Sequence, residues 1–163
     1  MKTYEFYDTC ALLLKVDDLW ENPNVQIVIS SITLNELENI KSSYNKDADI
    51  KYSARKILNE LDKHLFEYRT IVWNKELEDK LKESSLVDNN DSRIIISAKF
   101  VEDTMFPDDK MIFFTNDLCC KYIAHTILKS NIASYFPKEK KYDGFKKVYL
   151  DEEQMSELYC NMD

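Results

Sequence analysis

Glycine is almost missing from this sequence, which has one residue of that type, Gly144, among 163. Phosphate-binding loops need several glycines, because the backbone must approach the phosphate closely. The sequence therefore excludes a P-loop nucleotide site and a GxGxxG dinucleotide site. Histidine is also scarce, and neither His64 nor His125 stands at zinc-site spacing from a cysteine.

Long hydrophobic segments are absent as well. The longest apolar runs, such as residues 10–14 and 111–114, fall far short of the roughly 20 residues that a membrane-spanning helix needs. The first residues, MKTYEFYDT, lack the apolar core of a signal peptide. We therefore expect a soluble, cytoplasmic protein with no membrane partner.

Positive charge is in deficit, with 22 Lys and Arg against 30 Asp and Glu and a net charge of −8. This balance argues against a protein that coats nucleic acid by bulk positive charge. It leaves open a nuclease whose clustered carboxylates recruit a polyanion through bound cations. One basic stretch exists between Lys121 and Lys147, with seven lysines against Glu139 and Asp143. That stretch is either a nucleic-acid-binding patch or a solvated surface.

Short apolar strands alternate with amphipathic helices along the chain. The patterns predict strands at residues 4–7, 25–29, 70–73 and 111–114. They predict helices at residues 33–40, 54–68, 75–81 and 117–128, one that begins at residue 90 or 91, and a last one at 151–159. Such alternation produces right-handed crossovers between parallel strands, so we expect an α/β protein with helices on both faces of a parallel sheet.

Two acidic residues, Asp8 and Asp117, directly follow predicted strands. In open parallel sheets, ligands bind beyond the carboxyl ends of the strands, so both positions suit a binding or catalytic role. The alternative is structural, because an aspartate after a strand commonly caps the helix that follows. Position alone leaves both interpretations open.

Glu36 and Asp91 stand near the starts of predicted helices. Glu36 is the third residue after Thr33, the spacing of a capping box in which the glutamate reaches back to the first residue's amide. Asp91 is a candidate N-cap, with Asn90 and Asp88 as rival acceptors. Both acids therefore also have a structural alternative.

The order of four short motifs resembles that of the PIN-domain nucleases. The motifs are YDTCALL (7–13), TLNELENIK (33–41), NDSRIIISA (90–98) and TND (115–117), and the similarity covers roughly residues 4–136. Within that superfamily the chain is most similar to the PIN module joined to PhoH-type ATPases, through YSARKILNELDK (52–63) and DSRII (91–95). The resemblance implies a PIN-like three-layer α/β/α fold, with a central parallel sheet of four to five strands, in a nuclease domain of residues 1–136.

The resemblance also implies a catalytic acidic cluster that holds Mg²⁺ or Mn²⁺, formed by Asp8, Glu36, Asp91 and Asp117. Carboxylates suit these ions, because magnesium prefers oxygen ligands. Carboxylates brought this close repel one another, so at least one should have a raised pKa when no metal is bound. Supporting roles are expected for the hydroxyls of Thr9 and Thr115 and for Arg93, which either contacts phosphate, pairs with an acid of the site or is a surface residue. The expected nucleic-acid contacts are Lys121, Lys138, Lys140 and Lys141.

The function implied is that of a metal-dependent endoribonuclease that hydrolyses single-stranded RNA. Its rival is an RNA-binding or assembly module that does not cut. A phosphotransfer domain of the haloacid-dehalogenase type is disfavoured, because Cys10 stands where its second aspartate is needed. The lysine-rich extension at residues 137–163 is either the start of a linker to a missing PhoH-type ATPase domain or the tail of a free-standing PIN protein. The ATPase would belong to the same or another chain, and a homo-oligomer is expected because PIN domains often pair with themselves.

Overall fold

All strands of the sheet are parallel, as the alternation of strands and helices predicted. The computed structural model describes residues 1–137. Within them lie β1 (Thr3–Tyr7), β2 (Val25–Ser30), β3 (Tyr68–Ile71), β4 (Lys110–Phe114) and β5 (Asn131–Ala133). They form one sheet in the order β3-β2-β1-β4-β5. The predicted parallel sheet of four to five strands is therefore confirmed, with five strands in the described part of the chain.

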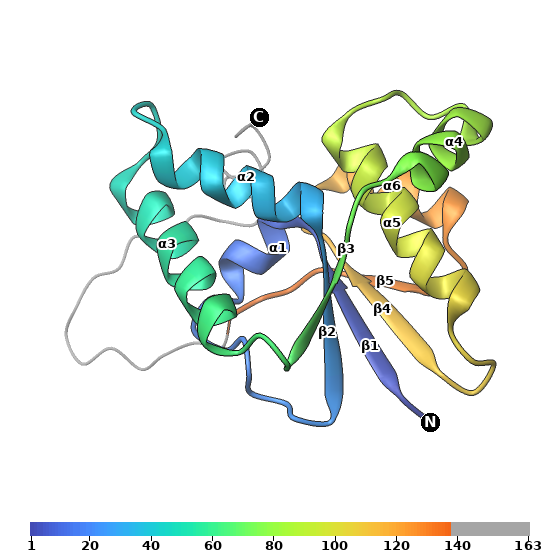
Figure 1. The fold of residues 1–163 in the computed structure, drawn as a ribbon, viewed down its shortest axis with the longest axis horizontal. Helices are drawn as coiled ribbons and strands as arrows, with labels where there is room; N and C mark the ends of the chain where they lie inside the picture. Colours follow the sequence, from blue (N-terminus) through green and yellow to red (C-terminus); the bar gives the residue numbers. More distant parts are fainter. Residues whose placement is uncertain (138–163) are drawn as a thin grey trace.

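Helices cover both faces of this sheet (Figure 1). On one face lie α1 (Thr9–Leu14), α2 (Ser31–Ser42) and α3 (Ala48–Lys63). On the other lie α4 (Lys75–Ser84), α5 (Asn90–Thr104) and α6 (Leu118–Ile127). The three-layer α/β/α architecture is thus the predicted one. None of the helices in residues 1–137 is long and apolar enough to cross a membrane.

Two hydrophobic cores hold the layers together, because successive side chains of a strand point to opposite faces. In β1, Phe6 packs into the core beneath α4 to α6, and Tyr7 packs into the core beneath α1 to α3. In β2, Val28 packs into the core beneath α4 to α6, and Ile29 packs into the core beneath α1 to α3. Strands buried on both faces read as continuous apolar runs, which is why β2 and β4 were recognisable in the sequence.

The register of the strands brings the candidate acids toward one edge of the sheet. Tyr7 is aligned with Ile29 of β2 and with Phe114 of β4. The Asp8 N–H donates a hydrogen bond to the Phe114 carbonyl oxygen at 3.0 Å, which extends this pairing by one residue. Because α1, α2 and α6 follow β1, β2 and β4 with at most three residues between them, their amino ends lie at this edge.

Several predicted boundaries were wrong. The second long helix was predicted at residues 54–68, but α3 occupies Ala48–Lys63, and Tyr68 belongs to β3. The helical spacing of Leu65 and Tyr68 continues past the end of α3 without a helix, and Leu65 is 59% exposed. The strand predicted at 70–73 is β3, two residues earlier, and the helix predicted at 75–81 extends to Ser84. The sequence did not predict β5, which has only three residues. The helix predicted at 151–159 lies outside the described residues.

Candidate active site

Asp8 is a buried carboxylate at the junction of β1 and α1. Its Oδ1 accepts a hydrogen bond from the Ala11 N–H at 2.8 Å, so it caps α1 as the structural interpretation predicted. Asp8 is only 3% exposed. A helix cap does not require such burial, and removing a carboxylate from water disfavours its charged form unless other groups compensate. The cap alone therefore does not account for this position.

Glu36 is hydrogen-bonded to Thr9, the residue after Asp8, and takes no part in the predicted capping box. The N-cap of α2 is Ser30, so Thr33 already lies inside the helix and the predicted capping box is wrong. The Thr9 hydroxyl donates to Glu36 Oε1 at 2.7 Å and also lies 3.2 Å from Thr33 Oγ1. The residue after Asp8 thus holds the Glu36 carboxylate toward the end of β1.

Asp117 lies beyond the end of β4 and caps α6. Its Oδ1 accepts from the Cys119 N–H at 2.9 Å, so the predicted cap is again present. Its own N–H donates to Thr115 Oγ1 at 3.2 Å. Thr115 is fully buried, and its side chain also forms a hydrogen bond with Asp8. Thr115 therefore connects the two strand-end aspartates.

Asp91 lies within the first turn of α5 and is not its N-cap. Asn89 has that role, because its Oδ1 accepts from the Ser92 N–H at 2.9 Å. The prediction that Asn90 or Asp91 caps this helix is therefore wrong. The Asp91 side chain does not cap α5, and its negative charge raises the pKa of Asp8.

The three aspartates lie close enough to interact electrostatically. The pKa of Asp8 is raised from its ordinary value of 3.8 to about 7, chiefly by burial and also by the negative charges of Asp91 and Asp117. Hydrogen bonds from the Thr115 side chain and from the Ala11 N–H act in the opposite direction. Asp8 is thus a carboxyl group whose charge is poorly tolerated and which a nearby cation would stabilise.

Cys120, in the first turn of α6, lies within electrostatic reach of the same three aspartates. The side chain is 1% exposed, and burial raises the pKa of its thiol well above the usual value. The charges of Asp8, Asp91 and Asp117 raise this pKa as well. Because the thiol stays protonated, it serves as a small apolar wall of the site.

The chemistry of these side chains fits a hard divalent cation, because carboxylate oxygens are the ligands that magnesium and manganese prefer. In residues 1–137, however, no three His, Cys, Asp or Glu side chains are arranged as a group that could hold a metal ion. The structure therefore brings three aspartates within electrostatic reach and links Glu36 to Thr9, but it does not close a three-ligand set.

The basic residues expected at the site have other partners. Arg93 Nε lies 2.8 Å from Asp88 Oδ1, and the guanidinium carbon lies 5.6 Å from the centre of the Trp73 ring. Asp88 is not one of the four candidate acids. Lys121 Nζ donates to Ser134 Oγ at 3.1 Å. The other predicted nucleic-acid contacts, Lys138, Lys140 and Lys141, lie outside the described residues.

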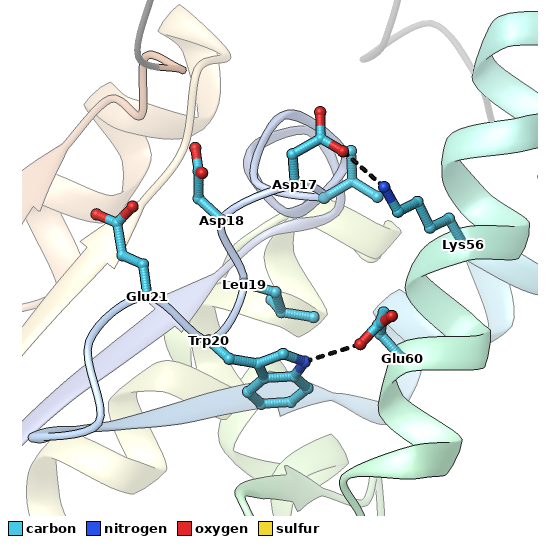
Figure 2. Close-up of a pocket in the computed structure, with 8 residues that line it drawn as sticks. Asp17, Asp18, Leu19, Trp20, Glu21, Lys56 and Glu60 are labelled. Carbon is cyan, nitrogen blue, oxygen red and sulfur yellow. Dashed lines mark hydrogen bonds and ion pairs between the residues drawn. The ribbon is translucent and has the colours of Figure 1, made fainter.

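A pocket of about 300 Å³ lies between residues 16–21 and α3 (Figure 2). Its walls are formed by Val16, Asp17, Asp18, Leu19, Trp20, Glu21, Lys56 and Glu60. None of the four candidate acids lines it. Across the pocket, Lys56 pairs with Asp17 at 2.8 Å, and Trp20 Nε1 donates to Glu60 at 3.2 Å (Figure 2). These contacts fasten the segment after α1 to α3.

The sequence patterns assigned no role in the site to three residues that the fold places at this edge. Thr33 was interpreted as a cap, although the neighbouring Ser30 offered an equally good cap. Cys120 is buried in the first turn of α6, and nothing in the sequence placed it beside the acids. Asn116 lies between Thr115 and Asp117, and its amide pairs with the main chain of Tyr135. Only the TND motif pointed to this asparagine.

A parallel sheet between two layers of helices, with aspartates at the carboxyl ends of its strands, is typical of α/β proteins whose ligand sites lie beyond those strand ends. The sequence matches the PIN domain family over residues 6–128, and the chain therefore belongs to that family. No curated protein matches it.

A solved structure shares the fold. A domain of a functionally unknown protein from Methanocaldococcus jannaschii DSM 2661 is similar, with a TM-score of 0.52 and 18% sequence identity. The likeness covers 93% of this chain and 100% of that chain. At this identity it shows the fold alone. PIN domains are generally nucleases and typically use divalent metal ions, so family membership indicates a nuclease-type function in general terms.

Proposed function

We propose that this protein is a Mg²⁺- or Mn²⁺-dependent endoribonuclease that hydrolyses single-stranded RNA. Four acids would hold the cation and carry the catalysis: Asp8, Glu36, Asp91 and Asp117. The observation that carries the proposal is the burial of Asp8 at a strand end, with two further aspartates within electrostatic reach. A fold that needed only a helix cap would gain nothing from gathering like charges around it.

The side chains of this protein have distinct tasks in the proposed reaction. Asp8 is oriented by the Ala11 N–H and by Thr115, and Glu36 is oriented by Thr9. A bound divalent cation would supply a water of lowered pKa and offset the charge that develops on the phosphate oxygens. No side chain need act as the nucleophile. Magnesium is commonly held by only one or two carboxylates together with waters and substrate phosphate, so it does not require a three-ligand cage.

The proposal is tested with purified protein and end-labelled RNA. We expect single-stranded RNA to be cut when Mn²⁺ or Mg²⁺ is present and to stay intact in EDTA. Asp8→Asn should abolish cutting, because asparagine retains the cap but loses the negative charge. Asp47→Asn is the matched control, because Asp47 also caps a helix, α3, through its Oδ1. Full activity of purified Asp8→Asn would refute the assignment, and duplex RNA and single-stranded DNA test the substrate class.

One observation favours a second candidate function, that of an RNA-binding or assembly module that does not cut. Residues 1–137 do not form a closed three-ligand group. A binder would retain RNA in a filter assay and give no metal-dependent products under the same conditions. Products that disappear in EDTA would exclude this candidate.

The motifs at residues 52–63 and 91–95 support a further part of the proposal, that the protein works with a PhoH-type ATPase in the same or another chain. We also propose that the protein is cytoplasmic. We further propose that the PIN domain associates with itself, and light scattering of the purified protein tests this self-association. The ATPase partnership is tested by co-expressing this chain with a PhoH-type ATPase domain. Separate elution of the two proteins in gel filtration would count against it.

A further inference from the structure

Asn116 connects the candidate site to a segment far along the chain. Its Nδ2 donates to the carbonyl oxygen of Tyr135 at 2.9 Å, and the Tyr135 N–H donates to its Oδ1 at 3.1 Å. The side chain thereby pairs with both polar groups of one main-chain residue, as a neighbouring β-strand would. Asn116 is 9% exposed, so the two hydrogen bonds are made away from bulk water, where leaving them unmade is costly.

Tyr135 is a rigid anchor for this clamp of two hydrogen bonds. Its hydroxyl donates to Asp18 Oδ2 at 3.0 Å, and the ammonium of the buried Lys15 lies 4.7 Å from its ring centre. The ring also meets Phe114 edge-on, with centroids 6.4 Å apart. Tyr135 is thus held from three sides by residues on β4, at the end of α1 and in the segment after it.

We propose that Asn116 is a positioning residue for Asp117. Residues 115–117 form the turn that carries the Asp117 carboxylate from the end of β4 to the start of α6. In this turn Thr115 is held by its N–H bond to Ala133 at 2.9 Å. Among residues 1–137, the Asn116 side chain forms hydrogen bonds only with Tyr135, and these fix the backbone immediately before Asp117. The inference rests on the proposed function, because the orientation of Asp117 matters most when the acids hold a cation together.

The test measures Mn²⁺ affinity by the electron paramagnetic resonance signal of free Mn²⁺, with thermal unfolding recorded for each variant. We expect Asn116→Ala to raise the Mn²⁺ Kd by about tenfold, the size of effect typical for residues that orient metal ligands. Asn116→Asp keeps the acceptor for the Tyr135 N–H but places a carboxylate against the Tyr135 carbonyl oxygen. Its added negative charge alone would tighten cation binding, so an increased Kd in this variant isolates the effect of the clamp.

Tyr135→Phe is the matched control, because it removes the hydroxyl bond to Asp18 but keeps both main-chain bonds to Asn116 and the ring contacts with Lys15 and Phe114. We expect its Kd to stay within about twofold of the wild type, since the residues that orient the ligands are retained. An unchanged Kd in Asn116→Ala, with a lower melting temperature, would show a purely structural role and overturn the inference. If Asn116→Ala does not fold, a Kd for Asn116→Asp at or below the wild-type value overturns it equally. Failure of the wild type to bind Mn²⁺ would instead overturn the proposed function itself.

Discussion

The burial of Asp8 makes a prediction about stability that does not depend on catalysis. Its pKa rises from 3.8 in an ordinary environment to about 7 in the folded protein, first because of burial and then because of Asp91 and Asp117. Between those two values the folded state holds a proton that the unfolded state has released. The free energy of unfolding should therefore fall as pH rises from 4 to 7, and stay low above that.

The magnitude follows from the size of the shift. A difference of about three pKa units corresponds to about 4 kcal/mol between the two protonation states. Asp8→Asn removes the titration and keeps an N-cap that accepts from the Ala11 N–H. In EDTA at pH 8 the variant should be more stable than the wild type by up to about 4 kcal/mol. For a chain of this length that corresponds to a melting temperature higher by on the order of 10 °C.

Urea unfolding of both proteins between pH 4.5 and 8.5, always in EDTA, measures this difference. The stability of Asp8→Asn minus that of the wild type should be small in acid, grow through neutral pH and level off above it. Asp47→Asn, which alters another cap, should show no such profile. A variant that is less stable than the wild type at pH 8, or a difference that does not change with pH, would refute the reasoning. In a separate series without EDTA, Mn²⁺ should stabilise the wild type selectively, because a ligand that binds only the folded state raises its stability.

Three further predictions concern single hydrogen-bonded side chains, two near the site and one at the opposite edge of the sheet. Asn89→Ala should lower the free energy of unfolding by about 1 kcal/mol through loss of the α5 cap, whereas Asn90→Ala should have little effect in the same urea titration. Thr9→Val should weaken metal-dependent RNA cleavage by about 10- to 100-fold because Glu36 loses the hydroxyl that orients it, and equal activity of Thr9→Val and Thr9→Ser would contradict this. Glu102 accepts hydrogen bonds from the N–H groups of Lys129 and Ser130 and from the Ser130 hydroxyl, just after α6. Burial alone would raise the pKa of Glu102, but these hydrogen bonds and one from Lys99 lower it below its usual value. Glu102→Ala should therefore destabilise the protein by about 2 kcal/mol near neutral pH, and calorimetry should show this difference shrinking as the pH falls below 4.5, the ordinary value for the group.

Boundaries were predicted less well than the elements themselves. The helical pattern of α3 runs on through Leu65 and Tyr68, and nothing local shows that the chain has already turned into β3. For α5, neighbouring asparagines and aspartates are all good caps. Which of them takes the role depends on the direction from which the chain enters the helix, and that direction is set by α4 and by packing on the sheet.

The sequence by itself determined the class of fold and the places where acids follow strands. Apolar runs long enough for buried strands, alternating with amphipathic helices, admit few arrangements other than a parallel sheet covered on both faces. The sequence therefore predicts that Asp8 and Asp117 lie at one edge of the sheet. These features are readable because they depend on local periodicity and on the direction of the chain.

Only the tertiary structure decided what each acid does at that edge. Asp8 and Asp117 both cap helices, as local spacing allowed, yet burial and neighbouring charge give Asp8 a property that no cap requires. Ser30, and not Thr33, caps α2, and the Glu36 carboxylate accepts a hydrogen bond from Thr9. Asn89, and not Asp91, caps α5. Burial, the sum of nearby charges and the choice among equivalent caps all depend on residues distant in the chain, so they become fixed only when the layers pack.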